Sequence, residues 1–370
     1  MHYNVAIVGA GMAGASLAAE LAPHASVLLL EAEDQPGYHS TGRSAAFWSE
    51  TYGGPLVQPL TTASYDFLAN PSADFCGHSL LGPRGALHVA QDEGMHALVA
   101  LAGEFSGTAV SLEKVDRAGL SAALPGLKAG WDHGIAEPSC KDIDVAALHG
   151  AYLRQARRSG ARLVTSGQLR SAARVGSAWR VETAAGSFQA DILVNAAGAW
   201  ADDVAALCGA MPIGIRPFRR TVAQVRVSPP ADPGLPLVMD ALGRFYFKPE
   251  SGRLWLSPHD ETPCEAGDCA PDEVDVATAI HWLEQLVDWR VERVERSWAG
   301  LRSFAPDRLP VYGFATDVSG FFWFAGQGGF GIQTAPAAAK IAAALLLGNA
   351  ADPMVVGIDP APYAPGRFMN

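Results

Sequence analysis

The hydrophobic pattern is clearest at the start of the chain. An apolar run of strand length at residues 5–8 leads into Gly9-Ala10-Gly11-Met12-Ala13-Gly14, and residues 15–22 have the pattern of a helix. A second apolar run at residues 26–30 ends at Glu31. Strand, glycine turn, helix and strand in this order predict a βαβ unit.

The glycine turn and Glu31 together predict a dinucleotide site. Gly9 permits the tight turn, Gly11 lets a pyrophosphate approach the backbone, and Gly14 lets the helix lie close to the strand. The start of the helix offers free N–H groups and a partial positive charge to the phosphates. Glu31 lies roughly 20 residues past the glycines, where an acidic side chain binds a ribose. A chance glycine turn that binds no nucleotide is the alternative.

Residues 32–49 are mostly small and polar, which predicts a loop. Its length beside the nucleotide site predicts that it wraps the cofactor, the alternative being a plain surface connection. Helical spacing then recurs, and Asp144 and Gly160 suit the two ends of one such helix. The predicted helices are residues 57–68, 94–105, 143–160, 271–287 and 336–347.

Short strands separated by turns are predicted in the middle of the chain, at residues 86–89, 169–175, 179–183, 187–190, 221–227, 244–248 and 253–257. Their partial alternation of apolar and polar positions indicates a mostly antiparallel sheet. Two runs, at residues 191–195 and 321–325, differ because small residues follow them directly. We expect these two to be buried parallel strands that return to the sheet of the βαβ unit.

The pattern as a whole predicts an α/β fold, α+β overall, with two interleaved domains. The expected nucleotide domain comprises residues 1–75, 141–210 and 300–370, and the expected substrate domain residues 76–140 and 211–299. A length of 370 residues supports two domains, because a single domain usually has about 100–200.

Charge and cysteine usage exclude several classes of partner. A net charge of −11 argues against a nucleic-acid surface or an anionic membrane. The longest apolar run, residues 341–347, is far shorter than the roughly 20 residues of a membrane span. The five cysteines form no CxxC pair and no cluster with histidine, so we expect reduced thiols, no metal site and a cytoplasmic location.

Motifs throughout the chain carry a family resemblance. They are the Gly9 to Gly14 turn with Glu31, Gly37-Tyr38-His39-Ser40-Thr41-Gly42-Arg43-Ser44-Ala45-Ala46, Val194-Asn195-Ala196-Ala197-Gly198-Ala199-Trp200, Trp298-Ala299-Gly300-Leu301-Arg302, and the glycines between Gly326 and Gly331. On these motifs the chain resembles the D-amino acid oxidase, glycine oxidase and sarcosine oxidase group. Within that group it looks most like bacterial D-arginine dehydrogenase, which shares the stretches at residues 37–46, Phe245-Tyr246 and Gly328 to Thr334. The resemblance implies a Rossmann-type domain that binds FAD. Relatives with covalent flavin have a cysteine just after the Gly-Leu-Arg motif, where this chain has Ser303-Phe304-Ala305-Pro306, so we expect FAD to be non-covalent.

The cofactor residues that the resemblance implies are Gly9, Gly11, Met12, Ala13, Gly14, Glu31, Ala32, Thr41, Gly42, Arg43, Ser44, Ala45, Ala46, Ala196, Gly198, Trp200, Arg302, Gly328, Gly329, Phe330, Gly331, Ile332 and Gln333. Backbone N–H groups of residues 329–333 and the start of the last helix are expected at the pyrimidine end of the flavin. Reduction adds negative charge there, and an oriented helix N-terminus stabilises negative charge.

The reaction implied is the oxidation of an amino acid by hydride transfer from Cα to flavin N5. A guanidinium is the best clamp for the substrate carboxylate, and the resemblance assigns this role to Arg220 and Arg302. It also implies a hydroxyl donor at Tyr246 and an active-site cap at Tyr52. No general base is evident, and none is needed if the substrate amine loses its proton on binding.

Each assignment has a structural alternative. Arg220 could lie on the surface or contact a phosphate, because Arg219 is adjacent. Arg302 could pair with Asp307, Tyr246 could be a core residue, and Tyr52 could lie outside the site. We expect His39 and His259 to be satisfied or exposed histidines rather than catalysts.

The expected substrate pocket contains Phe47, Ala86 and Gln327. D-arginine dehydrogenase has a carboxylate near the position of Ala86 and a histidine at that of Phe47, and this chain has neither. A methyl group cannot pair with a cation, so arginine should be a poor substrate. We expect a neutral, apolar or aromatic D-amino acid to be converted to an imino acid, then to a 2-keto acid and ammonia.

Two other classes of function remain open at this point. The same clamps would serve a 2-hydroxy acid, such as 2-hydroxyglutarate, or an N-methyl or cyclic imino acid. A non-catalytic flavin-binding partner is less favoured, because such a protein has no use for a carboxylate clamp. Oxygen and a quinone are both possible electron acceptors.

Overall fold

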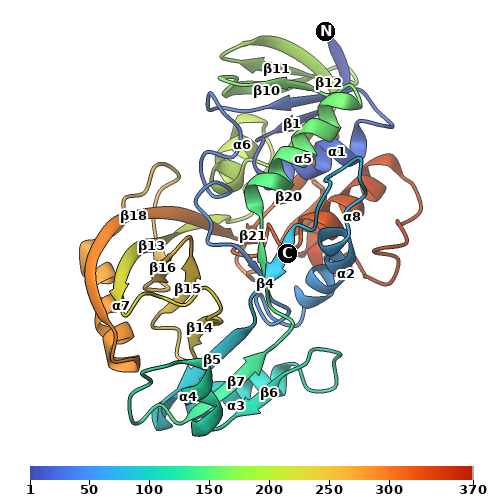
Figure 1. Cartoon of the computed structure of the whole chain (residues 1–370). Helices are drawn as coiled ribbons and strands as arrows, with labels where there is room; N and C mark the ends of the chain where they lie inside the picture. Colours follow the sequence, from blue (N-terminus) through green and yellow to red (C-terminus); the bar gives the residue numbers. More distant parts are fainter. Residues whose placement is uncertain (369–370) are drawn as a thin grey trace.

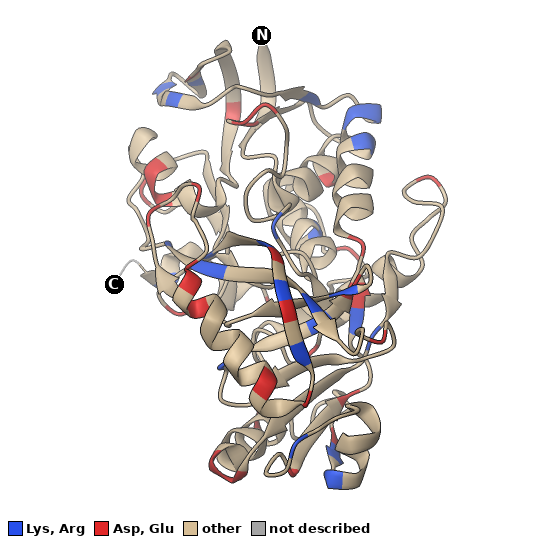
Figure 2. Cartoon of the chain, turned by 60° about the vertical axis from the view of Figure 1, so that its left-hand side comes forward, with Lys and Arg blue, Asp and Glu red and all other residues tan. Residues whose placement is uncertain are grey.

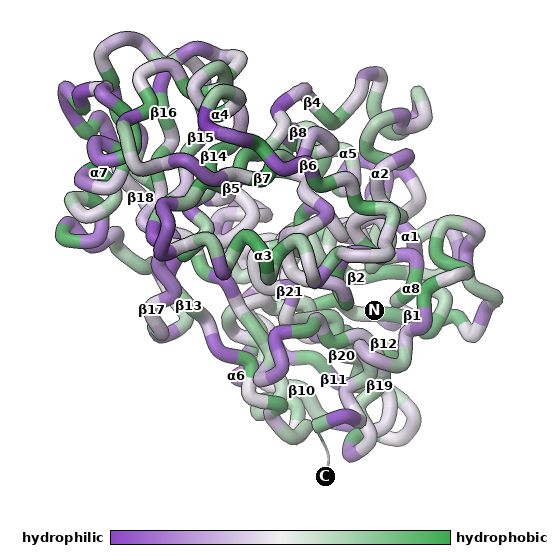
Figure 3. Tube along the Cα trace, turned by 90° about the horizontal axis from the view of Figure 1, so that it is seen from below, coloured by the Kyte–Doolittle hydropathy of each residue, from purple (hydrophilic) through white to green (hydrophobic). Residues whose placement is uncertain are grey.

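The structure is a computed structural model that describes residues 1–368. Its strands form an eight-stranded sheet, a ten-stranded sheet and a small three-stranded sheet between them. Figure 1 shows the eight-stranded sheet at the top and the ten-stranded sheet below it and to the left, and Figure 3 shows the same separation from another side. Among the described residues, no helix combines the length and the hydropathy that a membrane crossing needs.

The eight-stranded sheet has a parallel centre in the order β2, β1, β12, β20. Its strands are β1 (His2–Val8), β2 (Val27–Leu30), β9 (Arg162–Val164), β10 (Leu169–Val175), β11 (Ala178–Thr183), β12 (Gly186–Asn195), β19 (Val311–Phe314) and β20 (Phe321–Ala325). The central strands are apolar on both faces because both are covered. On β20, Phe322 and Phe324 face one core, whereas Phe321 and Trp323 face the other.

Helices cover the two faces of this sheet. The first core contains apolar residues of α1 (Met12–Leu21), α2 (Gln58–Ala69), α5 (Val145–Arg158) and α8 (Ala335–Leu347). The second core contains α6 (Ala201–Leu207). Helix α1 begins at Met12, inside the glycine motif that follows β1, so its first residues lie at the carboxyl end of the parallel strands.

The ten-stranded sheet is antiparallel except where β14 pairs with β5. Its strands are β5 (Ala86–Ala90), β6 (Glu113–Val115), β7 (His133–Glu137), β13 (Arg216–Ser228), β14 (Leu237–Asp240), β15 (Tyr246–Glu250), β16 (Arg253–Ser257), β17 (Thr262–Pro263), β18 (Arg290–Phe304) and β21 (Gln327–Gly328). The helices around it are α3 (Met95–Glu104), α4 (Arg117–Ala123) and α7 (Glu273–Leu286).

Strand alternation gives this sheet two different faces. Phe245 and Phe247 point into a core with α4 and α7, whereas Tyr246 between them points to the opposite face. The small sheet of β3 (Phe47–Trp48), β4 (Leu81–Pro83) and β8 (Lys141–Ile143) links the two large sheets.

The pairing of β13 with β18 places two predicted site residues on neighbouring strands. In this register Arg220 lies opposite Gly300, and Phe218 lies opposite Arg302. The sequence pattern did not predict β18, because its first half, Arg-Val-Glu-Arg-Val-Glu-Arg, repeats every three residues and does not alternate apolar and polar positions. Figure 2 shows these charges along the long strand.

The other element predictions are largely confirmed. All five helices are present within a few residues of their expected ends, and the Asp144 side chain accepts a hydrogen bond from the backbone N of Ala147 at 2.9 Å. Residues 187–190 and 191–195 belong to one strand, β12, rather than two. The sequence did not predict α4 and α6, which have seven residues each.

The packing of α1 on the glycine turn generates a testable prediction. A Cβ added to Gly14 would lie 1.8 Å from the backbone O of Gly9, so Gly14→Ala must push α1 away from β1. We expect a loss of about 1–3 kcal/mol in unfolding free energy and less bound flavin per chain, measured by thermal unfolding and absorbance.

A matched control is Gly103→Ala in α3, where an added Cβ meets no atom within 4 Å. This change should leave flavin content intact and should be neutral or stabilising by up to about 1 kcal/mol. Equal effects of the two substitutions would contradict the packing argument.

Candidate active site

A cavity of about 590 Å³ lies at the carboxyl end of the parallel strands. Its walls come from the glycine turn and the start of α1, from residues 31–44, from the segment after β12, and from residues 301–303 and 324–338. This is the edge at which open α/β sheets bind their ligands.

The glycine turn fits closely against its neighbours. Gly9 has φ +100°, and an added Cβ would lie 2.4 Å from the backbone O of Ala196, at the end of the neighbouring strand. The backbone N of Met12 donates to Oγ1 of Thr41 at 3.0 Å, which ties the start of α1 to the loop that follows β2. The turn is therefore tightly constrained, and the loop of residues 32–49 is hydrogen-bonded to it through Thr41.

The carboxylate of Glu31 lies at one wall of the cavity and accepts two backbone hydrogen bonds. Its Oε2 accepts from the N of Ala10 at 3.0 Å, and its Oε1 accepts from the N of Glu33 at 3.1 Å. Glu31 thus joins the glycine turn to the next loop. Its contact with a ribose stays a prediction.

Most of the predicted cofactor residues line this cavity, but seven do not. The lining residues are Gly9, Gly11, Met12, Ala13, Glu31, Ala32, Thr41, Ser44, Ala196, Gly198, Trp200, Arg302, Gly328, Gly329, Gly331 and Ile332. Ala45, Ala46 and Gln333 line a second, smaller cavity, and Gly14, Gly42, Arg43 and Phe330 line neither. Arg43 forms an ion pair with Asp268 and donates to the O of Ala299 at 3.2 Å, so it connects the wrapping loop to the ten-stranded sheet.

Several lining residues were not predicted. Gly167, Gln168 and Leu169 come from the turn between β9 and β10, and Asp203, Val204 and Leu207 come from α6. These residues lie in no motif, so only the folded chain shows that they reach the cavity.

The smaller cavity, about 40 Å³, adjoins the large one and is called the chamber here. It shares Ser44, Arg302, Gly329 and Ile332 with the large cavity. Its other lining residues are Ala45, Ala46, Phe47, Tyr52, Arg220, Met239, Tyr246, His259 and Gln333. All four predicted catalytic residues therefore meet in one place, at the junction with the large cavity.

Arg302 is a buried cation without a counter-ion in the part of the chain that the structure describes. It is 6% exposed, its Nε has no hydrogen-bond partner, and its Nη1 makes only a 3.5 Å contact with the O of Leu301. Asp307, the alternative partner, pairs instead with Nε of Arg367 at 2.6 Å. Burying an unpaired charge is costly, so this guanidinium indicates a site for an anion.

Arg220 is also buried, at 3% exposure, but other groups position it. Its Nε donates to the O of Asp260 at 2.8 Å, and its Nη2 donates to Oε1 of Glu261 at 2.9 Å. Glu261 is shared with Arg308, which donates to it at 2.9 Å. The guanidinium is thus held in a fixed orientation at the chamber.

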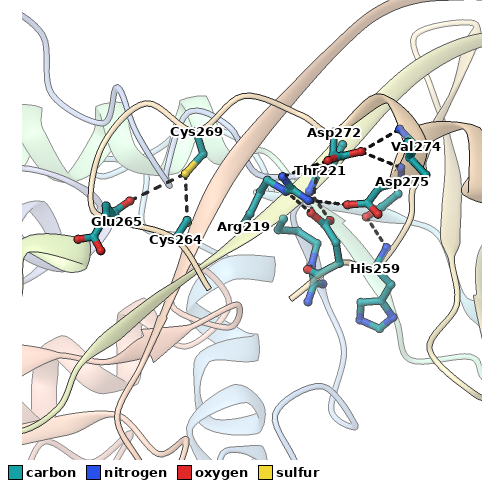
Figure 4. Close-up of polar contacts among 12 residues, drawn as sticks. Arg219, Thr221, His259, Cys264, Glu265, Cys269, Asp272, Val274 and Asp275 are labelled. Atoms are coloured by element: carbon teal, nitrogen blue, oxygen red, sulfur yellow. Dashed lines mark hydrogen bonds and ion pairs between the residues drawn. The ribbon is translucent and has the colours of Figure 1, made fainter. Parts of the chain in front are cut away.

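Arg219 points to the opposite face of β13 and has a structural role. It donates to Asp260 at 3.0 Å and to Asp275 at 2.5 Å, and its third acidic neighbour is Asp272 at the start of α7. Figure 4 shows this acid network around Arg219. The alternation of the strand therefore separates the two adjacent arginines, and only Arg220 lines the chamber.

The aromatic residues form the rest of the chamber wall. The ring of Phe47 lies 5.4 Å from that of Tyr52 and 6.4 Å from that of Tyr246. The hydroxyl of Tyr52 lies directly over Gly329, because a Cβ there would be 1.8 Å from it. Trp48 faces away, and its Nε1 donates to the O of Thr61 in the core.

Two buried side chains fix the backbone that carries Tyr52. Glu137 on β7 accepts from Oγ of Ser49 at 2.9 Å, from Oγ1 of Thr51 at 2.7 Å and from the N of Glu50 at 2.6 Å. Gln333 accepts from the N of Ser49 at 3.1 Å, and its Nε2 donates to the O atoms of Ser49 and Tyr52. Residues 49–52 are therefore rigidly placed between β7 and the start of α8.

His259 lines the chamber, so the expectation that it is satisfied or exposed is wrong. Its Nδ1 is buried and has no partner among the described residues, and its ring lies 5.3 Å from that of Tyr246, edge to face. Burial and the charges of Arg220 and Arg302 lower its pKa to about 3, so the imidazole is neutral. No motif contains His259. His39 is paired at one ring nitrogen only: its Nε2 lies 2.8 Å from Glu33, whereas its buried Nδ1 has no hydrogen-bond partner and lies 3.6 Å from Asp268.

Two predicted pocket residues lie outside the chamber wall. Ala86 packs behind it with Ala45, Met239 and Tyr246. Gln327 lines the large cavity, and its Nε2 donates to the O of Phe324 at 3.0 Å. Of the three predicted pocket residues, only Phe47 borders the chamber directly.

The described residues contain no group of three or more histidine, cysteine or acidic side chains that could hold a metal ion. All five cysteines are free thiols. Cys269 lies 3.1 Å from Cys264, sulfur to sulfur, on the loop before α7 (Figure 4). Burial and this neighbour raise the pKa of Cys264 to about 12, so its thiol is protonated.

Comparisons with known proteins agree with this geometry. A family model described as FAD dependent oxidoreductase matches residues 4–345. Glycine oxidase of Pseudomonas aeruginosa is 29% identical over 396 residues, covering all of both chains.

Solved structures show the same fold. Glycine oxidase from Geobacillus kaustophilus superposes with a TM-score of 0.86 at 23% identity, over 98% of each chain. L-proline dehydrogenase from P. horikoshii superposes with a TM-score of 0.85 at 20% identity, over 99% of this chain and 97% of that one. The chain therefore belongs to the FAD dependent oxidoreductase family, and its cofactor is FAD.

Proposed function

We propose that the chain oxidises a small neutral D-amino acid, or glycine, at the bond between Cα and nitrogen. The product would be an imino acid, which water converts to a 2-keto acid and ammonia. The observation that carries the proposal is the unpaired guanidinium of Arg302 beside Arg220, where the chamber meets the cofactor cavity. The resemblance to D-arginine dehydrogenase supports the D series, and the name of the Pseudomonas aeruginosa relative supports glycine.

The two arginines suit a carboxylate. A guanidinium presents parallel N–H donors that match the two carboxylate oxygens, and the pairing is stronger in a buried site than in water. Arg220 already has one acidic partner, Glu261, whereas Arg302 has none among residues 1–368. A substrate carboxylate would supply the missing counter-charge.

The size of the chamber favours a small substrate. A volume of about 40 Å³ corresponds to roughly three water molecules at about 10–15 Å³ each. Aromatic side chains and Met239 line it, and no Asp or Glu is among its lining residues. These features narrow the expected apolar or aromatic substrate to a small one, and they offer no partner to the side chain of D-arginine.

The residues of the chain would act by binding and positioning. FAD, when bound, supplies the acceptor for a hydride. Arg220 and Arg302 would hold the substrate carboxylate and so fix the position of Cα in the chamber. Tyr246 would add a hydroxyl donor, and Phe47 and Tyr52 would exclude water. Ala335 at the start of α8 lines the large cavity, so the positive end of the helix dipole faces the cofactor.

A second candidate function is the oxidation of a small 2-hydroxy acid. It is favoured by the imidazole of His259 at the chamber, because hydroxy acid oxidation benefits from a nearby base. The low pKa of His259, about 3, weighs against this role, since such an imidazole takes up a proton poorly. The amino acid therefore remains the better candidate.

A panel of substrates tests the proposal. Under anaerobic conditions we expect glycine or D-alanine to bleach the flavin of the holoenzyme faster than D-leucine or D-phenylalanine. The kcat/KM for D-arginine should be at least about 100-fold lower than that for glycine or D-alanine, because an unpaired buried charge costs about 3 kcal/mol or more. Bleaching by lactate alone would favour the second candidate, and no bleaching by any amino acid would refute the first.

Substitution of Arg302 tests the clamp. Arg302→Met should lower kcat/KM by about 10²–10⁴-fold, because a buried charge-assisted pair is lost. The same change should leave the melting temperature of the substrate-free holoenzyme unchanged or raise it, because it removes a buried charge that has no partner.

The matched control is Arg367→Met, which breaks a recorded ion pair with Asp307 away from both cavities. It should lower stability and leave kcat/KM within about twofold, since a partly exposed ion pair is worth about 1 kcal/mol or less. An Arg302→Met variant that unfolds more easily but keeps its activity would show that Arg302 is structural.

A further inference from the structure

We infer that His259 receives the amino group of the substrate, accepting a hydrogen bond from its N–H while Arg220 and Arg302 hold the carboxylate. This inference rests on the proposed function and adds to it the residue that recognises the second polar group of an amino acid. It explains why a histidine occupies this position.

The backbone places the imidazole at the chamber. His259 comes two residues after β16, whose last residue, Ser257, lies opposite Tyr246 in the sheet. The backbone N of His259 donates to Oγ of Ser257 at 3.1 Å, which fixes the turn. Figure 4 shows the ring pointing away from the acid network around Arg219, and the ring meets Tyr246 edge to face.

The conformation of His259 carries costs that folding alone does not explain. Its φ of +56° is in the left-handed region, which non-glycine residues seldom adopt. The other three non-glycine residues with positive φ in residues 1–368, Ser166, Ser251 and Arg308, are exposed, whereas His259 borders a cavity. A strained residue at the chamber wall indicates a functional constraint.

The hydrogen-bonding state of the His259 ring also indicates a functional constraint. Buried polar groups nearly always have a partner, and leaving one unpaired costs about 1–3 kcal/mol. Nδ1 of His259 is buried without one, and no hydrogen bond is recorded for Nε2 among the described residues. Because Nδ1 lies beside Gly243, a polar ligand in the chamber would give the ring a hydrogen bond by reaching Nε2.

The chemistry of the chamber leaves His259 as the acceptor that suits an amine. Arg220 and Arg302 can only donate. The amide of Gln333 is occupied by Ser49, Tyr52 and Thr61. The remaining polar side chains are the hydroxyls of Ser44, Tyr52 and Tyr246, which both donate and accept, and the imidazole of His259, whose unprotonated nitrogen can only accept.

The charge state of the ring supports this assignment. A neutral imidazole has one nitrogen lone pair, whereas an imidazolium has none. Burial and the two arginines keep the pKa of His259 near 3, so the lone pair is present at any pH at which the enzyme would be assayed. A neutral ring also does not repel the amino group when it arrives protonated.

The test uses two ligands that cannot be oxidised and that differ by one group. 2-Aminoisobutyrate has an amino group but no hydrogen on Cα, and isobutyrate has the same carbon skeleton without the amine. Binding of each to the oxidised holoenzyme is followed by the change in the visible spectrum of the flavin. We expect His259→Phe to weaken 2-aminoisobutyrate about tenfold, the effect of one hydrogen bond, and to leave isobutyrate within twofold.

Two more variants separate the hydrogen bond from the fold. Asn tolerates the left-handed backbone and offers an amide oxygen, so His259→Asn should retain most of the affinity for 2-aminoisobutyrate. His259→Gly also removes the imidazole, but without backbone strain. It replaces the Phe variant in the binding test if that variant binds too little FAD. With a good substrate, the deletion should raise KM more than it lowers kcat.

Equal losses for the two ligands, or no loss for either, would overturn the inference. Failure of the proposed function is recognised separately, because the unmodified holoenzyme would then bleach with no amino acid, whatever the variants show. A wild-type enzyme that is reduced by glycine or D-alanine, combined with equal ligand losses in His259→Phe and His259→Gly, refutes only the role of His259.

Discussion

The chamber depends on an imbalance of charge between two paired strands. Strands β13 and β18 bring two guanidinium groups into a site where most of their surface is shielded from water. The acidic residues near them are already engaged: Asp260 accepts from Arg219 and Thr221, and Glu261 is divided between Arg220 and Arg308. The result is a pocket with excess positive charge that a small anion can neutralise, and this excess is the basis for the proposed chemistry.

The rest of the fold holds this charged pocket against the cofactor cavity. Arg43, on the loop after β2 that borders the large cavity, pairs with Asp268 and donates a hydrogen bond to the O of Ala299 on β18, so the two sheets are tied together beside the chamber. On the other side, Glu137 from β7 and Gln333 from the start of α8 fix the short segment that carries Tyr52. Arg220, Tyr246 and Arg302 therefore come from the ten-stranded sheet, the glycine turn and Glu31 follow strands of the eight-stranded sheet, and these polar contacts hold the two sheets together.

Local patterns predicted the nucleotide half of the protein well and the substrate half less completely. The glycine turn, Glu31 and the apolar strands around them are recognised from the first 31 residues alone. The five predicted helices have clear periodicity or caps. Arg220 and Arg302 were identified only through a family resemblance. The register of β13 with β18 places them together. Strand β18 could not be predicted from apolar positions, because its first half carries charged residues without the usual alternation. No sequence motif marks His259, because its place at the chamber depends on which residues the fold brings around it. Ala86 is the reverse case, an expected pocket residue that lies behind the wall of the chamber.

The way the cofactor cavity is assembled also constrains the order in which the protein can mature. Its walls include residues near position 10, near 40, near 168, near 200 and from 301 to 338. Strand β1 lies between β2, which follows it closely, and β12, which is made almost 200 residues later. A ribosome adds roughly 5–20 residues each second, so β12 is synthesised many seconds after β1 and β2. The glycine turn is therefore among the first parts to be synthesised, and the cavity that it lines is among the last to be completed. FAD can be captured only by a nearly finished chain, and until then the central strands must be kept from pairing elsewhere.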